Sequence, residues 1–299
     1  MDINFELYKI FYHVAKNNSF SDAAVKLHVS QSAISQAIKN LEDKTGSQLF
    51  FRSTREIKLT SEGQILFKHI EQAYNFIKTA ESKLLESQNL ENGEIRIGVS
   101  DTICKYYLID PIDRFIQKHP KVKIQVINRT SHQIQNILKE GIIDFGIVTL
   151  PVQAKGIAVE NYISVEDTFV ACNKFRDILK RPLSMKELSG YPLLMLDKSS
   201  STRQNIDSIL QKRGLNLVPE IELESIDLLL EFAKIGLGIA HVLKESALPF
   251  IDKGELFEVK LKEKLPLRKL GIITMKNVPL SRTSSEFILF LSSKVIPKY

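Results

Sequence analysis

The chain has 299 residues, of which 43% are hydrophobic, and its formal net charge at pH 7 is +6. This length suits two or three domains with real hydrophobic cores. No apolar run approaches the roughly twenty residues that cross a membrane, and the first residues lack the basic and then apolar pattern of a secretory signal. Two cysteines are too few for a disulfide framework. We therefore expect a cytoplasmic protein with no membrane partner.

The basic balance permits nucleic-acid binding without proving it. Residues 1–62 hold eight lysines and arginines against seven aspartates and glutamates, a net charge of only +1. Any affinity of this region for nucleic acid must therefore come from where its charges lie rather than from their sum.

Residues 5–16 carry apolar and aromatic side chains at helical spacing, which predicts a first helix that supplies the core of a small domain. The aromatic rings could instead form a stacking platform for single-stranded nucleic acid, but the spacing favours core packing. A shorter second helix is expected at residues 22–27, with Ser21 as its N-cap. A tight turn at His28 and Val29 then leads to the next helix.

The third predicted helix begins after Ser30, which is a good N-cap. Its apolar residues Ile34, Ile38 and Leu41 recur at i, i+4 and i+7 and form one stripe. The opposite face carries small polar, amide and lysine side chains, which can form the hydrogen bonds that base edges in a major groove require. The candidate DNA-reading residues are Ser30, Gln31, Ser32, Ser35, Gln36 and Lys39. Two short helices and a polar second helix indicate helix-turn-helix, although many such pairs bind nothing.

A β-hairpin wing is expected at residues 49–60, after a helix C-cap at Gly46. It carries Arg52, Arg55 and Lys58, which are suited to phosphates or to a narrow minor groove. These three basic residues complete the candidate DNA interface.

At these residues the chain resembles the LysR-type transcriptional regulators. Three features carry the resemblance: an Ala-Ala pair before Leu-x-Val-Ser, a Ser-Gln-x-Ala-Ile-Ser helix start, and Leu-Phe-x-Arg-x-x-Arg-x-x-x-Leu-Thr-x-x-Gly ending at Gly63. The family often has Pro where this chain has Ser32, and Arg where it has Gln36. An amide at Gln36 suits adenine rather than guanine, so the preferred DNA site is expected to differ from the usual one.

Residues 62–90 are expected to form one long helix with apolar or small residues at alternating intervals of four and three, a heptad seam. The seam residues are Leu66, Ile70, Ala73, Ile77, Ala80 and Leu84. Such a helix most simply pairs with its own copy, and a paired scaffold would present two winged domains to an interrupted palindrome. The alternative is a helix that lies on a larger domain of the same chain.

After Asn92 and Gly93 the pattern changes to strands alternating with helices, which predicts a parallel α/β sheet. Strands are expected near residues 94–99, 122–127, 144–149, 167–172, 193–196, 238–242, 256–261 and 270–274. Helices are expected up to about residue 118 and near residues 131–139, 184–188, 201–213, 225–235 and 281–295.

This register resembles the effector domain of the same family, which has the fold of type 2 periplasmic binding proteins. The resemblance implies an α+β multidomain chain: a winged helix-turn-helix domain at residues 1–61, a dimerisation helix at 62–91, and a two-lobed α/β effector domain. Lobe I would comprise residues 92–162 and 267–299, and lobe II residues 163–266. The second crossover between the lobes is taken from the family, since periodicity does not reveal it.

Ligands of open α/β sheets bind beyond the carboxyl ends of strands, at helix N-termini that favour anions. Three segments meet this rule, and the candidate effector residues in them are Ser100, Asp101, Thr102, Thr149, Ser199, Ser200, Ser201, Thr202 and Arg203. Hydroxyls and an arginine at a helix start suit a carboxylate or phosphate, although serines there could act as N-caps alone. Asp101 argues against a purely anionic ligand.

His241 follows a glycine-containing strand entry, where the family usually has an apolar residue. We consider two interpretations: a hydrogen-bonded histidine of the core, or a cleft-wall residue whose charge near neutral pH tunes an acidic effector. Either way the segment is no dinucleotide loop, because the third glycine of that fingerprint is absent.

We therefore predict a sequence-specific, DNA-binding transcriptional regulator, a homodimer or homotetramer, controlled by a small anionic metabolite. Its partners would be promoter DNA, its own copy, the effector and RNA polymerase. No metal, cofactor or catalytic site is indicated, since the six histidines are scattered and Ser199–Ser201 lack the GxSxG elbow. The alternative function is that of a small-molecule carrier without specific DNA recognition.

Overall fold

The computed structural model of the protein describes residues 2–51, 57–88, 93–152 and 154–293. The chain divides into two compact units, residues 1–85 and 86–299, each with its own core. Within the described ranges no helix is both long enough and apolar enough to cross a bilayer.

The N-terminal unit begins with three helices, α1 (Phe5–Asn17), α2 (Phe20–Leu27) and α3 (Gln31–Thr45). Apolar residues from all three, including Phe11, Ala23 and Ile34, form one buried cluster. The sequence misplaced the start of α2: the N-cap is Ser19, whose hydroxyl accepts the amide hydrogen of Asp22 at 3.1 Å. Ser21 is instead the second residue of the helix, within its first turn.

The turn between α2 and α3 is tight because His28 adopts a left-handed conformation, with φ of 55°. Ser30 then caps α3 by accepting the amide hydrogen of Ala33 at 3.2 Å, as predicted. Gly46 ends the helix with φ of 65°, a left-handed conformation that glycine adopts without steric cost.

A short antiparallel pairing, in which Phe50 lies opposite Leu59, forms the base of the predicted wing. The Glu42 carboxylate of α3 accepts the amide hydrogens of Leu49 and Phe50, at 2.7 and 3.3 Å, and so ties the wing to the helix before it. Residues 52–56, which belong to the predicted wing, lie outside the described residues.

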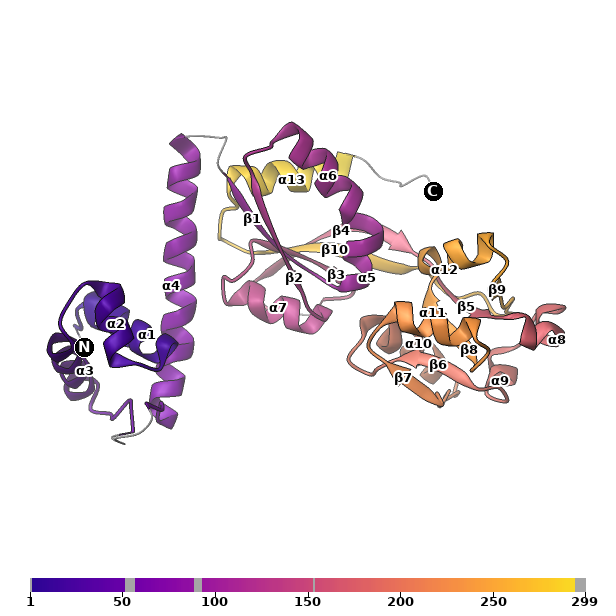
Figure 1. Ribbon diagram of the computed structural model, residues 1–299, viewed down its shortest axis with the longest axis horizontal. Coiled ribbons are helices and arrows are strands. Elements are labelled where there is room, and N and C mark those ends of the chain that lie inside the picture. The colour runs from indigo at the N-terminus through magenta and orange to yellow at the C-terminus, as the bar shows by residue number, and fades with distance from the viewer. Residues whose placement is uncertain (1, 52–56, 89–92, 153, 294–299) are drawn as a thin grey trace. The chain divides into compact units, whose positions relative to one another are not determined.

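One long helix, α4 (Ser61–Gln88), follows the wing and appears in purple in Figure 1. Leu66 and Ile70 pack against the core of the three short helices. Further along α4, Ile77 and Leu84 are 39% and 67% exposed. The predicted seam therefore has two parts: its first turns are half-buried in the helix's own unit, and its later turns face solvent in the single chain.

The C-terminal unit contains two five-stranded sheets, which define two lobes (Figure 1). The sheet of lobe I has the order β2-β1-β3-β10-β4, and that of lobe II has the order β7-β6-β8-β5-β9. The strands of lobe I are β1 (Glu94–Val99), β2 (Lys123–Asn128), β3 (Phe145–Thr149), β4 (Ile157–Val165) and β10 (Arg268–Met275). Those of lobe II are β5 (Asp167–Ala171), β6 (Leu193–Leu196), β7 (Ile221–Leu223), β8 (Ile239–Leu243) and β9 (Phe257–Glu258).

Helices cover the sheets of both lobes. In lobe I, Phe115 and Phe287 pack in one core cluster and Ile134 in another, so the helices that carry them lie on opposite faces of the sheet, as Figure 1 shows. The helical elements of lobe I are α5 (Asp101–Ile103), the π-helical turn η2 (Cys104–Leu108), α6 (Ile109–Lys118), α7 (Ser131–Lys139) and α13 (Arg282–Ser293). Those of lobe II are η3 (Asn173–Phe175), α8 (Arg176–Leu179), α9 (Met185–Leu188), α10 (Ser201–Gln211), α11 (Ile226–Lys234) and α12 (Lys244–Asp252).

The expected parallel pairing holds for β1 with β2 and β3 and for β6 with β7 and β8, but both sheets are mixed. β10 runs antiparallel to both β3 and β4, and β5 runs antiparallel to β8 and β9. The reversal arises because the chain leaves lobe I through β4, crosses directly into β5, and returns through β10. β4, β7 and α12 were also missed, and the expected strand at 256–261 is reduced to β9.

Candidate functional site

The face of α3 opposite its buried stripe is open to solvent. Ile34, Ile38 and Leu41 are 0 to 4% exposed and anchor the helix. All six candidate residues of this helix and its cap are exposed: Ser30, Gln31, Ser32, Ser35, Gln36 and Lys39. Because the helix is fixed by one face, the other presents a rigid row of donors and acceptors of the kind that base edges pair with.

The wing contributes one described cation. Lys58 is exposed beside the pairing at its base, where its carbonyl accepts the amide hydrogen of Phe51 at 2.9 Å. Arg52 and Arg55 lie outside the described residues. The described part of the candidate DNA interface is thus the polar face of α3, with Lys58 at the base of the wing.

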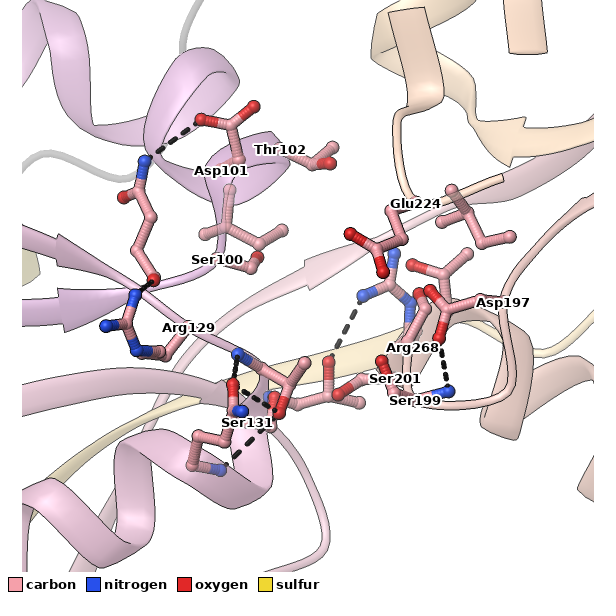
Figure 2. Close-up of a pocket in the computed structure, with 18 residues that line it drawn as sticks. Ser100, Asp101, Thr102, Arg129, Ser131, Asp197, Ser199, Ser201, Glu224 and Arg268 are labelled. Atoms are coloured by element: carbon pink, nitrogen blue, oxygen red, sulfur yellow. Dashed lines mark hydrogen bonds between the residues drawn. The ribbon is translucent and has the colours of Figure 1, made fainter. Parts of the chain in front are cut away.

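A cavity of about 600 Å³ lies between the two lobes of the C-terminal unit. It is lined at the carboxyl ends of strands from both sheets, as expected for an open α/β fold. Of the predicted effector residues, eight line it: Ser100, Asp101, Thr102, Thr149, Ser199, Ser200, Ser201 and Thr202. Figure 2 shows Ser100, Asp101 and Thr102 across the cavity from Ser199 and Ser201. The two lobes therefore bring together segments that are a hundred residues apart in sequence.

Arg268, at the start of β10, forms part of the cavity wall and joins the lobes. Its guanidinium donates to both carboxylate oxygens of Asp167 at 2.8 and 2.9 Å, and to the hydroxyl of Thr149 at 3.2 Å. Both charged side chains are only 2–3% exposed. Arg268 and Asp167 stand at the two points where the chain crosses between the sheets, so a bidentate ion pair ties the crossovers together.

A second bridge between the lobes is exposed. The Lys105 ammonium of η2 lies 2.8 Å from both carboxylate oxygens of Asp227, in the first turn of α11. An exposed pair of this kind contributes little stability. It nevertheless marks a contact between the lobes that would break if they separated on this side.

Arg203 does not line this cavity, contrary to the prediction. Its side chain is 4% exposed and donates to Asp207, Glu222 and the carbonyl of Leu196 at 2.9 to 3.0 Å. The serines before it face the cavity, but position 203 lies on another face of α10, toward β7. The Arg203 guanidinium thus ties α10 to the sheet of lobe II.

His241 is also absent from the cavity lining. It lies in the middle of β8, 2% exposed, with its ring 4.8 Å from that of Phe169. Burial lowers the pKa of His241 to about 4, so the imidazole is neutral at physiological pH. The core interpretation therefore holds for its position, although its Nε2 atom has no hydrogen-bond partner among the described residues.

Sequence reasoning missed several cavity residues. These are Ile103, Asn128, Arg129, Thr130, Ser131, Gln133, Leu196, Asp197, Glu224 and Arg268. The strand-end rule could have found most of them, because Asn128 ends β2 and residues 129–131 follow it, Asp197 follows β6 and Glu224 follows β7. Arg268 is the first residue of its strand, at the amino end, where the strand-end rule gives no signal.

These features, a rigid exposed helix-turn-helix face and a separate two-lobed unit with a polar cavity, define a DNA-binding regulator with a ligand-binding domain. The family model described as bacterial regulatory helix-turn-helix protein, lysR family, matches residues 5–64. The model of the LysR substrate binding domain matches residues 88–295. The chain therefore belongs to the LysR family of transcriptional regulators, which are not enzymes, and it combines DNA binding with small-molecule control.

Relatives of known name agree with this assignment. A probable RuBisCO transcriptional regulator of Cyanidium caldarium is 30% identical over 295 residues, covering 93% of this chain and 90% of the relative. The uncharacterized HTH-type transcriptional regulator YeiE of Escherichia coli (strain K12) is 25% identical and is covered completely. The carrier alternative, without specific DNA recognition, is therefore not favoured.

Solved structures share the fold over the whole length. Full-length CbnR in complex with its target DNA has a TM-score of 0.69 at 16% identity, covering 97% of this chain and 99% of that one. HinK, a LysR family transcriptional regulator from Pseudomonas aeruginosa, has a TM-score of 0.60 at 22% identity, covering 98% and 99%.

Replacing Arg268 by Met should destabilise the C-terminal unit by roughly 3–5 kcal/mol, because it leaves Asp167 buried without its counter-ion. Urea unfolding of the purified variant measures this. The double variant Arg268→Met with Asp167→Leu removes both charges and should recover most of the loss. If the single variant unfolds at the wild-type urea concentration, the ion pair does not hold the crossovers.

His241 predicts a pH dependence of stability. Its folded pKa of about 4 lies below the usual histidine value of 6.5, so the unfolded chain binds the proton more readily. Stability therefore falls as pH drops from about 6.5 towards 4. His241→Phe should flatten this part of the stability curve, measured by urea unfolding at a series of pH values. The same substitution at the exposed His132 is the control, and equal flattening in both variants would contradict the assignment.

Proposed function

We propose that the exposed face of α3 reads base edges in the major groove of promoter DNA. The observation that carries this proposal is the division of one helix into a buried apolar stripe and an open polar row. Gln31, Ser35 and Gln36 would contact bases, while Lys58, Arg52 and Arg55 would contact the phosphates or the minor groove.

We propose further that α4 pairs with its copy in a second chain, in a homodimer or in a homotetramer built from such dimers. Because Leu66 and Ile70 are half-buried in their own unit, the seam would be concentrated in the later turns, at Ala73, Ile77, Ala80 and Leu84. The exposed apolar side chains of Ile77 and Leu84 support this division. A dimer formed through α4 would place two winged helix-turn-helix domains on one DNA duplex.

The cavity between the lobes is the proposed effector site. We assign domain limits of 1–61, 62–91, 92–162 with 267–299, and 163–266, so that the cavity lies between the last two. The effector would carry an anionic group. It would act by binding more tightly to one arrangement of the lobes than to another, since unequal affinity is what shifts a conformational equilibrium. The regulated partner would be RNA polymerase, and the protein would work in the cytoplasm.

Replacing Gln31 or Ser35 by Ala should lower the preference for a bound promoter fragment over a scrambled duplex by roughly tenfold, because direct base contacts carry 1–3 kcal/mol of discrimination. Replacing Lys58 by Ala should instead weaken binding to both duplexes and reduce the salt dependence of affinity, because a phosphate contact is lost. Fluorescence anisotropy over a salt series measures both effects. Identical behaviour of the two kinds of variant would show that these roles are wrong.

Ile77→Glu with Leu84→Glu should convert the dimer to a monomer at micromolar concentration, because it places like charges in the seam. Sedimentation velocity measures the species present. Substitution of the exposed Leu289 by Glu, on a helix of lobe I, is the matched control and should leave the assembly intact. A dimer that survives both seam charges would place the interface elsewhere.

A further inference from the structure

Five charged side chains line the cavity between the lobes, and their balance indicates the kind of ligand it takes. Asp101, Asp197 and Glu224 are acidic, and Arg129 and Arg268 are basic. The ligand must match the charges that the protein itself has not already neutralised, because an unpaired charge in a partly closed site is costly.

Arg268 adds no net charge to the cavity. The Asp167 carboxylate, buried beside it, occupies its guanidinium in a bidentate pair. The remaining wall therefore has three carboxylates and one guanidinium, that of Arg129, a balance of −2. This excess of acid is unsuited to a ligand that carries only negative charge.

The hydrogen bonds described for two of these acids do not bring a positive charge to them. The carboxylate of Asp101 accepts from the side-chain amide of Asn128 at 3.0 Å, and that of Asp197 accepts from the backbone amide of Ser199 at 2.7 Å. Both donors are neutral. Glu224 is exposed to the cavity, and among the described residues no hydrogen bond or ion pair engages its side chain.

Lysines close in sequence do not supply the missing charge. The ammonium of Lys105, two residues beyond the cavity residue Ile103, is taken by Asp227. Lys198 lines a different cavity on lobe II, beside Arg203. The acidic wall formed by Asp197 and Glu224 is thus left for the ligand.

The charges are also separated in space. Figure 2 shows Arg129 and Asp101 on the side of lobe I, and Glu224 and Asp197 together on the side of lobe II. Arg129 precedes α7, whose N-cap is Thr130 and whose first residue, Ser131, also lines the cavity. The start of this nine-residue helix and the guanidinium both favour an anion. The lobe I wall thus carries one guanidinium and one carboxylate, with the start of α7 favouring an anion, and the lobe II wall carries two carboxylates.

We propose that the effector is a small zwitterion, of the amino-acid class, which spans the two lobes. Its carboxylate pairs with Arg129 at the start of α7, and its ammonium lies at the carboxylates of Asp197 and Glu224. This assignment rests on the proposed function of the cavity as the effector site. Because each end of the ligand meets a different lobe, a zwitterion binds the closed arrangement more tightly than an open one, which gives it the unequal affinity that regulation requires.

The test uses thermal shift and calorimetry on the full-length protein. The probes are the standard L-amino acids, each accompanied by its amine without the carboxylate and its acid without the amino group, with dicarboxylates of equal chain length. At least one amino acid should raise the melting temperature, since a ligand of the folded state stabilises it, and its single-charge analogues and the dicarboxylates should not.

Variants then locate the two ends of the ligand. Glu224→Gln and Arg129→Gln should each weaken binding of that amino acid by about tenfold or more, the usual effect of losing a charge-assisted hydrogen bond. Glu220→Gln, at an exposed position of the same lobe outside the cavity lining, is the matched control. Two outcomes would contradict a zwitterionic effector but leave the effector site in place. One is a dicarboxylate whose binding requires Arg129, and the other is an amino acid whose binding is unchanged by Glu224→Gln.

If no probe shifts the melting temperature, the amino-acid class is wrong. If a probe binds but neither cavity variant weakens it, the proposed effector site itself fails. DNA affinity is measured on the same preparations, with and without the bound probe. This separate readout distinguishes a failure of the probe to regulate DNA binding from a failure of the probe to bind the protein.

Discussion

Two charged side chains, Arg268 and Asp167, meet where the chain passes between the two sheets of the C-terminal unit, and both are almost completely buried. Neither could be tolerated there alone, because an unpaired buried charge costs several kcal/mol. Their pairing holds the start of β10 against the start of β5, at the crossovers that join the lobes. The third donor of Arg268 reaches Thr149 in the cavity, so the same interaction that joins the crossovers also shapes the ligand site.

The N-terminal unit relies on a different constraint, the anchoring of α3 by one face. Its net charge is small, so affinity for DNA depends on the position of a few cations and on a helix that is held rigidly in place. The buried stripe supplies that rigidity, and the hydrogen bonds from the wing to Glu42 hold the neighbouring hairpin to the same helix. A reading surface that is fixed before binding loses little conformational entropy on contact with DNA.

Much of this could be predicted from the sequence, because periodicity reports which face of an element is buried. The stripe of α3, its cap at Ser30 and the strand β6 were expected at the observed residues.

The antiparallel course of β10 was not expected, since strand direction depends on where the chain returns and not on local pattern. β4 was missed because, as an edge strand, it has no clean alternation of buried and exposed residues. Arg203 was misassigned because its sequence neighbours face the cavity, whereas the rotation of roughly 100° from one helical residue to the next aims it at Glu222. Sequence alone could not show that Arg268 is already neutralised by a partner 101 residues away.

The central claim is that two α3 helices, one from each chain of a dimer, recognise DNA sequence. The most direct test is selection of duplexes from a random pool by the full-length protein. The account predicts enrichment of an interrupted palindrome whose half-sites lie about one helical turn or a multiple apart, as a two-fold assembly requires. Recovery of duplexes with no shared sequence, or of a single unrepeated half-site, would contradict it.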